Sequence, residues 1–274
     1  MTIIDLNADL GEGMGTDEAL LGIVSSASIA CGGHAGDAET IRRVLHLCKA
    51  NGVRAGAHPG YADRKRFGRF RLVMPLDRLL GQIREQMLLI RHVADAVGVP
   101  LAYVKLHGAL ANQTAEELAF AVGVFASIQA MDPHMAVLAL DNSEQVRAAR
   151  AVGLPLIREA YADRAYTPQG LLVPRSQPGA VIEDEDAVIA RCLRLARSGE
   201  IVAIDGSVIP SAARSICLHG DTPGAVDLAR NIRDALQSEG IGIAPDAPER
   251  DGPWDPQGGE GEIGNMPLSP KDPG

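Results

Sequence analysis

Short runs of β-branched and apolar residues alternate along most of the chain with segments of helical periodicity, and this alternation limits the possible folds more than any other feature. The predicted strands are residues 2–9, 25–31, 53–58, 101–107, 135–140, 155–160 and one strand between 201 and 219. Strands that alternate with helices in this way build a parallel sheet. About seven units allow the sheet to close, so we predict an α/β fold with a TIM-like (βα)7-type barrel. An open doubly wound sheet is the alternative.

Three of the intervening helices have recognisable ends. The predicted helices are 38–51 between Asp37 and Gly52, 115–130 after a capping box of Thr114 and Glu117, and 223–239 after Thr222 and Pro223. A capping side chain accepts a hydrogen bond from an unpaired amide of the first turn. Glycine favours the left-handed conformation that ends a helix, and proline at the first helical position loses no helix hydrogen bond.

The 274 residues are enough for one large core, and we expect a single βα-barrel catalytic domain over residues 1–244. Residues 245–274 are rich in proline, glycine and acidic side chains. A segment of this composition buries too little apolar surface to order itself, so we expect a disordered C-terminal tail. Its Trp254 is expected to be a solvated tail residue.

The net charge of -9 argues against a nucleic-acid partner, because phosphate binding depends on clustered lysine and arginine. The N-terminus lacks the basic segment and apolar run of a signal peptide, and no uncharged apolar run reaches the length of about 18 residues that a membrane helix needs. We therefore expect a cytoplasmic protein without membrane contact. The four cysteines form no C-x-x-C pair and are expected to be reduced and mostly buried.

Polar side chains gather at the predicted C-terminal ends of the strands, where parallel βα folds place their ligand sites. In the first strand, Asn7 and Asp9 share one face with Asp5 by the period of two, while apolar residues take the other face. Acids at inward positions of a barrel strand are costly unless they bind something. We therefore assign Asn7 and Asp9 to the site.

Later strands end in further polar residues of this kind. They are His34, His58, Lys105, His107, Glu159, Arg164 and His219. A lysine that points into a barrel has to be paired or has a depressed pKa, and either state suits it to polarise a carbonyl or phosphoryl oxygen. His46, His92 and His134 lie in helical or turn segments, where packing or solvation explains them. Cys31 has no feature that lowers its pKa, so we interpret it as a buried structural thiol.

The sequence matches neither of two common nucleotide-binding motifs. Gly11, Gly13 and Gly15 resemble a dinucleotide loop, but Thr16 stands at the position of the last glycine. The carboxylate of Glu12 would also repel a pyrophosphate. Neither G-x-x-x-x-G-K-[ST] nor G-x-S-x-G occurs in the sequence, so it indicates neither a P-loop nor a nucleophile elbow.

Eight motifs in one order give the chain a specific family resemblance. They are DLNADLGEG at 5–13, SASIACGGHAGD at 26–37, GAHPGYADR at 56–64, FGR at 67–69, VKLHGALAN at 104–112, EAYADRAY at 159–166, LVPRSQPGAVI at 172–182 and ICLHGD at 216–221. With these motifs the chain resembles the LamB/YcsF family over residues 3–244. Gly33, Tyr103, Leu106 and Ala111 depart from the residues that the family commonly has there, which concerns substrate fit more than reaction type.

The resemblance implies a fold and an activity. The fold is similar to the barrels of glycoside hydrolases and deacetylases. The implied activity is 5-oxoprolinase chemistry, the ATP-dependent hydrolysis of the lactam of 5-oxo-L-proline to L-glutamate. The resemblance also implies two partners, the B and C subunits, and the use of ATP with magnesium at the level of the complex. It leaves open whether this chain binds a metal.

The implied reaction suggests roles for the polar residues. An unactivated lactam is a poor electrophile, so phosphorylation of the ring oxygen is expected to precede the attack of water. Either Asp9 or Glu159 is then the general base. Lys105, with His107 and Arg175, holds the developing oxyanion, the phosphate or the substrate carboxylate. We assign catalysis to Asp9, Lys105, His107 and Glu159, and substrate binding to Asn7, His34, His58, Arg164, Arg175 and His219, with no residue assigned to a metal.

Two other functions stay open. Two histidines and a carboxylate with an open position form the common catalytic zinc site, which would make the protein a metal-dependent amide or carbohydrate deacetylase. The residues for this alternative are Asp9, His34 and either His58 or His107. In the other alternative the chain is a substrate-binding module of a multisubunit complex, and its acids are not needed for turnover.

Overall fold

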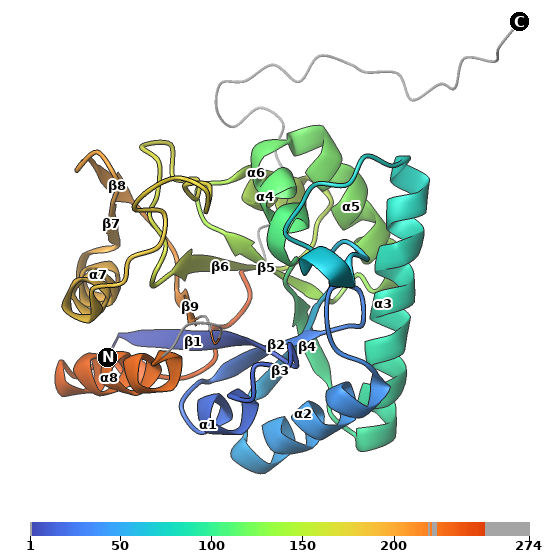
Figure 1. Cartoon of the computed structure of the whole chain (residues 1–274), viewed down its shortest axis with the longest axis horizontal. Helices are drawn as coiled ribbons and strands as arrows, with labels where there is room; N and C mark the ends of the chain where they lie inside the picture. Colours follow the sequence, from blue (N-terminus) through green and yellow to red (C-terminus); the bar gives the residue numbers. More distant parts are fainter. Residues whose placement is uncertain (1, 219, 221–223, 250–274) are drawn as a thin grey trace, which may run out of the picture.

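The computed structural model describes residues 2–218, 220 and 224–249. Within them, seven parallel strands form a closed barrel (Figure 1). The strands are β1 (Ile3–Leu10), β2 (Ser26–Ala30), β3 (Arg54–His58), β4 (Leu101–Val104), β5 (Ala136–Leu140), β6 (Leu156–Tyr161) and β9 (Ser215–Leu218). Each strand pairs with the next, and β9 pairs with both β6 and β1, which closes the ring. The predicted (βα)7-type barrel is confirmed, and the open doubly wound sheet is wrong.

The last predicted strand region contains three short strands instead of one. β7 (Glu200–Val202) and β8 (Val208–Pro210) form an antiparallel hairpin, and only β9 joins the ring. Figure 1 shows the hairpin next to α7 (Glu185–Ser198), at one side of the barrel. A further strand, β10 (Gly242–Ile243), pairs with the start of β1.

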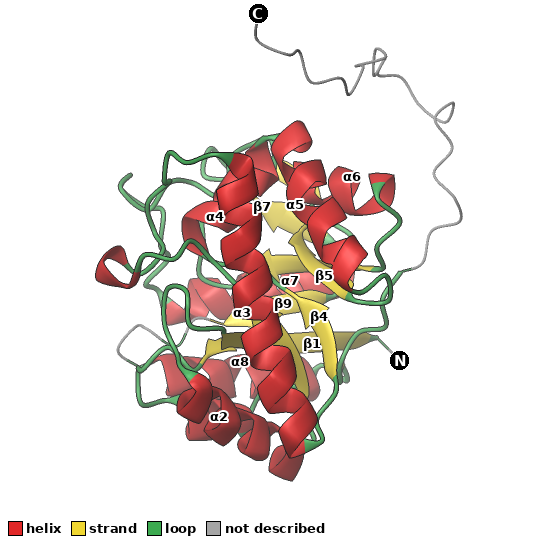
Figure 2. Ribbon diagram, turned by 90° about the vertical axis from the view of Figure 1, so that its right-hand side faces the viewer, coloured by secondary structure: helices red, strands yellow, loops and turns green. Residues whose placement is uncertain are grey.

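Helices surround the strands on the outside of the barrel (Figure 2). Besides α7 they are α1 (Asp17–Leu21), α2 (Ala38–Asn51), α3 (Leu76–Val97), α4 (Gly108–Glu116), α5 (Leu118–Met131), α6 (Glu144–Ala151) and α8 (Ala225–Ser238), with a short 3-10 helix at Arg64–Arg66. Long helices bury one stripe of apolar side chains against the sheet, as α2 does with Ile41, Val44, Leu45 and Cys48. None of the helices in the described ranges is long and apolar enough to cross a bilayer.

The first predicted helix is confirmed at both ends. α2 begins after Asp37, whose side chain accepts a hydrogen bond from the amide of Thr40 at 2.8 Å. Gly52 follows the helix with a φ of 67°. This left-handed conformation costs glycine little and satisfies carbonyls of the last turn.

The helix predicted at 115–130 begins elsewhere. α4 ends at Glu116 and α5 starts at Leu118, so two helices meet where one capping box was expected. The hydroxyl of Thr114 donates to the carbonyls of Leu110 and Ala111 in its own helix, at 3.0 Å each. The predicted cap was therefore wrong, because the hydroxyl is already satisfied by the preceding turn.

The barrel interior is polar at the end where the strands begin. Asp5 is fully buried and accepts hydrogen bonds from the hydroxyls of Ser25, Ser26 and Ser215, at 2.7, 2.7 and 2.6 Å. Arg54 adds an ion pair of 3.2 Å with the same carboxylate. Both carboxylate oxygens are thus compensated, which a buried charge requires.

The described chain also ends at this side of the barrel. The backbone of Glu249 pairs with that of Leu156, and the guanidinium of Arg158 binds the Glu249 carboxylate at 3.2 Å. Contact with the barrel continues as far as Glu249, beyond the predicted domain boundary at residue 244. The rest of the predicted tail, with Trp254, lies outside the described residues, as do Thr222 and Pro223 before α8.

Gly56 makes room for a large side chain inside the barrel. A Cβ atom at this position would lie 2.3 Å from the ring of Tyr103, which is buried and hydrogen-bonded to Ser28 at 3.1 Å. We expect Gly56→Ala to lower the free energy of unfolding by about 1–3 kcal/mol, as overpacking of a core does. Urea unfolding followed by circular dichroism measures the change.

Two further variants test the cause of this loss. Combining Gly56→Ala with Tyr103→Leu removes the ring and should restore part of the stability. Gly81→Ala is the control, because Gly81 is exposed in the middle of α3 and a Cβ there has nothing within 4 Å. It should be neutral or stabilise by up to about 1 kcal/mol. An unchanged urea midpoint for Gly56→Ala would contradict the expected overlap with the ring.

Candidate active site

A buried lysine is the centre of the polar cluster at the C-terminal end of the barrel. Lys105 directly follows β4, and its side chain is 2% exposed. Its ammonium nitrogen lies 2.9 Å from Oδ1 of Asp9 and 2.7 Å from Oε1 of Glu159. It also donates to Oδ1 of Asn7 at 3.2 Å and contacts Sγ of Cys217 at 3.0 Å. Residues of β1, β6 and β9 therefore all contact the ammonium group of Lys105.

The strand register brings these residues together. In β1, Asn7 and Asp9 both reach the lysine, as their predicted common face requires. Asn7 is level with Cys217 of β9, and Tyr161 of β6 is level with the same cysteine. The side-chain amide of Asn7 donates to Glu159 at 2.9 Å, which orients that carboxylate.

The two acids keep Lys105 charged. Burial alone would lower the pKa of Lys105, but the negative charges of Asp9 and Glu159 raise it well above its usual value. Burial raises the pKa of Glu159, although the lysine works against this shift. Burial also raises the pKa of Cys217 well above its usual range, so the thiol stays protonated. Lys105 therefore keeps a positive charge at a fixed position, which suits an oxygen that gains negative charge.

Three histidines and a glutamate lie beside the lysine cluster. His34, in the loop after β2, hydrogen-bonds through Nε2 with Oε1 of Glu12 at 2.9 Å. His58 ends β3, and its Nε2 lies 3.0 Å from Nδ1 of His107. Oε1 of Glu12 is 3.4 Å from Nδ1 of His107 and 3.9 Å from Nε2 of His58. Oδ2 of Asp9 is 3.4 Å from Nε2 of His58, so Asp9 joins the two clusters.

The histidines differ in their protonation. Burial, together with the charge of His58, lowers the pKa of His34 to about 2. Burial likewise lowers the pKa of His107 well below its usual value. For His58, burial is outweighed by the negative charges of Asp9 and Glu12, and its pKa is raised. His34 and His107 are therefore neutral imidazoles near pH 7.

A tight turn covers the histidines. The carbonyl of Phe67 accepts a hydrogen bond from Nε2 of His107 at 2.9 Å, and the Phe67 ring meets His34 and His107 edge-on. Phe67 and Gly68 both have positive φ, of 56° and 61°. A Cβ atom on Gly68 would lie 2.9 Å from Cβ of His34, so glycine is needed at this contact. The FGR motif thus fixes His107 and closes one side of the cluster.

Most of the predicted site residues meet at this barrel mouth. They are Asn7, Asp9, His34, His58, Lys105, His107 and Glu159. The prediction of a paired, inward-facing Lys105 is confirmed. His219 lies outside the described residues.

The two predicted arginines have other surroundings. The buried guanidinium of Arg164 donates to the carbonyls of Ala180, at 3.2 Å, and Val173, at 2.6 Å. Arg175 is exposed in the loop between β6 and α7, where its charge adds to the effect of burial in lowering the pKa of Arg164. Arg164 therefore anchors this loop to the strand end, and its contact with substrate stays a prediction.

Two members of the clusters are not among the predicted residues. Glu12 stands between Gly11 and Gly13, whose φ values of 74° and 82° turn the chain sharply after β1. An acid flanked by glycines, directly after an inward-facing strand, is the sequence signal for this position. Cys217 follows from the period of two in β9, because Ser215 and Cys217 share the inward face.

The lysine cluster borders a small pocket. Its lining residues are Lys105, Leu106, Ala111, Asn112, Ala115, Leu138, Leu140, Gln145, Glu159, Tyr161 and Leu172. Lys105 and Glu159 thus face a wall of mainly leucine and alanine side chains that also contains Asn112 and Gln145. Ala111, one of the departures from the family pattern, is part of this wall and so affects the shape of the pocket.

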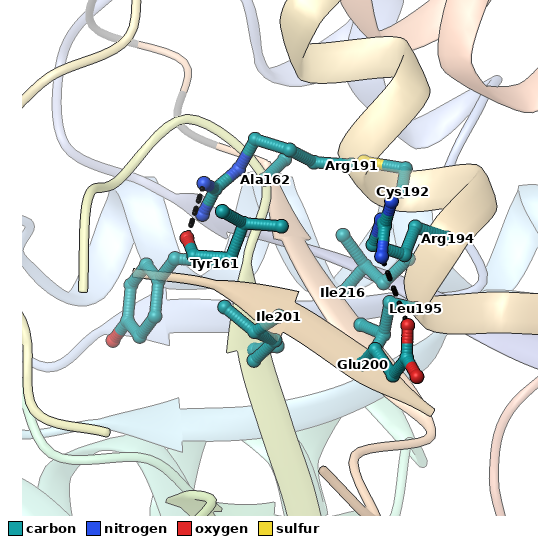
Figure 3. A pocket seen from close by; sticks show the side chains of 11 residues that line it. Tyr161, Ala162, Arg191, Cys192, Arg194, Leu195, Glu200, Ile201 and Ile216 are labelled. Atoms are coloured by element: carbon teal, nitrogen blue, oxygen red, sulfur yellow. Dashed lines mark hydrogen bonds and ion pairs between the residues drawn. The ribbon is translucent and has the colours of Figure 1, made fainter. Parts of the chain in front are cut away.

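A second hollow lies outside the barrel, between β6, β7 and α7 (Figure 3). Figure 3 shows Arg194 and Glu200 paired at its edge, at 2.9 Å, with Cys192, Leu195 and Ile216 around them. Arg194 and Glu200 therefore already satisfy each other, and the remaining lining is mainly apolar. The groups suited to chemistry lie at the barrel mouth, so we place the site there.

Comparisons with known proteins agree with this fold. The pattern of the LamB/YcsF family matches residues 4–250. The A subunit of 5-oxoprolinase from Streptomyces coelicolor is 47% identical over 246 residues, covering 88% of this chain and 98% of that protein. The protein of the same name from Streptomyces avermitilis is 47% identical over 247 residues, with coverages of 88% and 99%. The crystal structure of a lactam utilization protein from Thermus thermophilus superposes with a TM-score of 0.82 at 34% identity, covering 88% of this chain and 99% of that one. The chain therefore belongs to the LamB/YcsF family.

Proposed function

We propose that this chain is the A subunit of an ATP-dependent 5-oxoprolinase, which hydrolyses the lactam of 5-oxo-L-proline to L-glutamate. The names of its relatives support the activity, and their designation as subunits supports assembly with partners, which we take to be the B and C subunits. ATP with magnesium is used at the level of the complex. Because the reaction consumes ATP, we place the complex in the cytoplasm.

The observation that carries the proposal is a buried cation between two acids at the edge of an apolar pocket. The ammonium nitrogen of Lys105 lies within 2.9 Å of Asp9 and Glu159, and Lys105 and Glu159 both line the pocket. 5-Oxoproline has an apolar ring face, an amide carbonyl and a carboxylate. The wall of leucine and alanine side chains matches the ring, and Lys105 matches an oxygen of the substrate.

The proposed chemistry begins with an activated lactam. Transfer of a phosphoryl group from ATP to the ring oxygen makes the carbonyl carbon electrophilic. Water then attacks this carbon, with Asp9 or Glu159 taking its proton, and the C–N bond breaks as the ring nitrogen gains a proton. Hydrolysis of the resulting acyl phosphate releases L-glutamate and inorganic phosphate. Lys105 stabilises the negative oxygen in both steps.

Glutamate release tests the proposal directly. The purified chain is incubated with 5-oxo-L-proline and magnesium ATP, first alone and then with candidate B and C subunits. We expect glutamate, with matching phosphate release, only from the mixture. No glutamate from any mixture, or the same rate after omission of this chain, would refute the proposed role.

The histidine cluster favours one alternative, a metal-dependent amide or carbohydrate deacetylase. Glu12, His34, His58 and His107 bring their ligand atoms within 4.8 Å of one another. Such an enzyme would release acetate from N-acetylated sugars or amides without ATP and without partner subunits. Acetate release by the isolated chain would favour this alternative over lactam hydrolysis.

A further inference from the structure

We propose that His58, His107 and Glu12 bind one divalent transition-metal ion, of the class that includes Zn²⁺, with His34 supporting the site through Glu12. From the sequence alone these histidines are assigned to catalysis or substrate binding, and the metal alternative uses Asp9 and His34 with only one of His58 and His107, without Glu12. The proposal concerns binding by the isolated chain, so it does not depend on which reaction the protein catalyses.

The first argument is the direction of the two imidazole lone pairs. Nδ1 of His58 lies 2.9 Å from the carbonyl oxygen of Lys105, and Nε2 of His107 lies 2.9 Å from that of Phe67. A carbonyl only accepts, so each of these nitrogens carries the proton. The opposite nitrogens, Nε2 of His58 and Nδ1 of His107, then face each other at 3.0 Å. In two neutral imidazoles both nitrogens carry lone pairs, so the contact requires a cation, either the proton that the neighbouring acids favour on His58 or a metal ion that replaces this proton.

The second argument is the carboxylate beside this pair. Oε1 of Glu12 lies 3.4 Å from Nδ1 of His107 and 3.9 Å from Nε2 of His58. In a tetrahedral zinc site with bonds of about 2.0–2.1 Å, neighbouring ligand atoms are about 3.3 Å apart. The three distances of 3.0, 3.4 and 3.9 Å therefore surround a space of the right size. Two histidines and one glutamate are also a common catalytic zinc ligand set.

The third argument is the support behind the ligands. Metal-binding histidines usually donate their other N–H to a carbonyl or carboxylate, and ligand carboxylates are hydrogen-bonded in turn. His58 and His107 use the carbonyls of Lys105 and Phe67 in this way. Glu12 has its partner in Nε2 of His34, at 2.9 Å. The outer interactions that a metal site needs are thus already in place.

The position of His34 excludes it from the same inner ligand set. Its ring is stacked on that of His107, with centroids 3.5 Å apart and planes 4° apart. A lone pair lies in the plane of its own ring, so two parallel rings cannot both direct one at a single ion. His34 therefore acts on the ion through its hydrogen bond to Glu12, which leaves a coordination position for water or a substrate oxygen.

The site is continuous with the lysine cluster. Asp9 lies 3.4 Å from Nε2 of His58 through Oδ2 and 2.9 Å from the ammonium nitrogen of Lys105 through Oδ1. A divalent ion supplies Lewis-acid polarisation of a carbonyl or phosphoryl oxygen. Such an ion would stand on the opposite side of Asp9 from Lys105, at the same barrel mouth.

Metal binding by the untagged chain tests the proposal. Protein stripped with a chelator is titrated with Zn²⁺ in competition with a chromophoric chelator, and with Co²⁺ followed by visible absorption. We expect one ion per chain and a cobalt spectrum typical of low coordination number. His34→Ala should weaken binding by about 10- to 100-fold, the usual effect of losing an outer partner. His107→Ala, which removes a direct ligand, should weaken binding more than His34→Ala does.

Two variants complete the test. Glu12→Gln keeps the size of the side chain and should also weaken Zn²⁺ binding. It therefore replaces a histidine variant in the binding test if that variant fails to fold. His134→Ala is the control, because His134 is an exposed histidine in the turn before β5 and should leave binding unchanged. Absence of one-to-one binding by the unaltered chain would overturn the proposal. Equal binding by Glu12→Gln and the unaltered chain would do so as well. Metal binding by the chain, together with no glutamate release from any mixture of subunits, would support the metal site and reject the proposed reaction.

Discussion

Replacement of Lys105 by methionine is expected to reduce glutamate release by the assembled enzyme by about 100- to 1000-fold, the range for losing one stabilising group at a developing oxyanion. The methionine keeps the length of the side chain but removes the ammonium group that Asp9 and Glu159 surround. The lost interaction is expected to form mainly in the transition state, so kcat should fall more than KM rises. Steady-state kinetics with the B and C subunits measures both constants.

The same substitution is expected to destabilise the barrel. Removing one partner of a buried ion pair leaves uncompensated charge and typically costs about 3–5 kcal/mol. The assay therefore runs well below the melting temperature, with circular dichroism as the check on folding. Lys49→Met is the matched control, since Lys49 is exposed and contacts only the carbonyl of Val97, at 3.0 Å, among the hydrogen bonds of the described residues. A folded Lys105→Met enzyme with unchanged kcat would refute the role of Lys105.

Asp5→Ala is expected to lower the free energy of unfolding by about 3–5 kcal/mol, because it removes a buried charge that compensates another. Without this carboxylate, Arg54 loses its ion pair, and the hydroxyls of Ser25, Ser26 and Ser215 lose their common acceptor. For a chain of this size each kcal/mol corresponds to about 2–4 °C, so the melting temperature should fall by about 6–20 °C. Differential scanning calorimetry measures the shift.

A surface acid provides the comparison for Asp5. Asp227 is exposed and pairs with Arg230 one turn along α8, at 2.9 Å. Because an exposed helix pair contributes only about 0.3–0.5 kcal/mol, Asp227→Ala should move the melting temperature by about 2 °C at most. Equal shifts for Asp5→Ala and Asp227→Ala would contradict the structural role of the buried carboxylate.

The parts of the fold that follow from strand periodicity could be predicted from sequence. The alternation in β1 placed Asn7 and Asp9 on the inward face, and the spacing of Lys105 and His107 placed both at the end of β4. These predictions hold because a side chain in a strand has only two directions. The barrel then brings all strand ends to one mouth, so local patterns sufficed for most of the site.

The parts that depend on loops and distant contacts could not be predicted in the same way. The hairpin of β7 and β8 looked like one strand region, because a short apolar run does not show which neighbour it pairs with. Glu12 enters the histidine cluster only through a turn formed by two glycines. Arg164 is held by loop carbonyls 16 and 9 residues further along the chain, contacts that its strand-end position does not reveal.

The closing strand has a consequence for how the protein is made. β9 lies between β1 and β6, so Asn7 finds Ser215, 208 residues away in sequence, only when synthesis is almost complete. Until then the growing chain has an open barrel edge, and Asp5 lacks one of its hydroxyl partners. Long-range pairing of this kind slows folding and leaves strand edges exposed. A nascent or truncated chain without β9 therefore lacks the assembled site, and catalytic competence appears together with barrel closure.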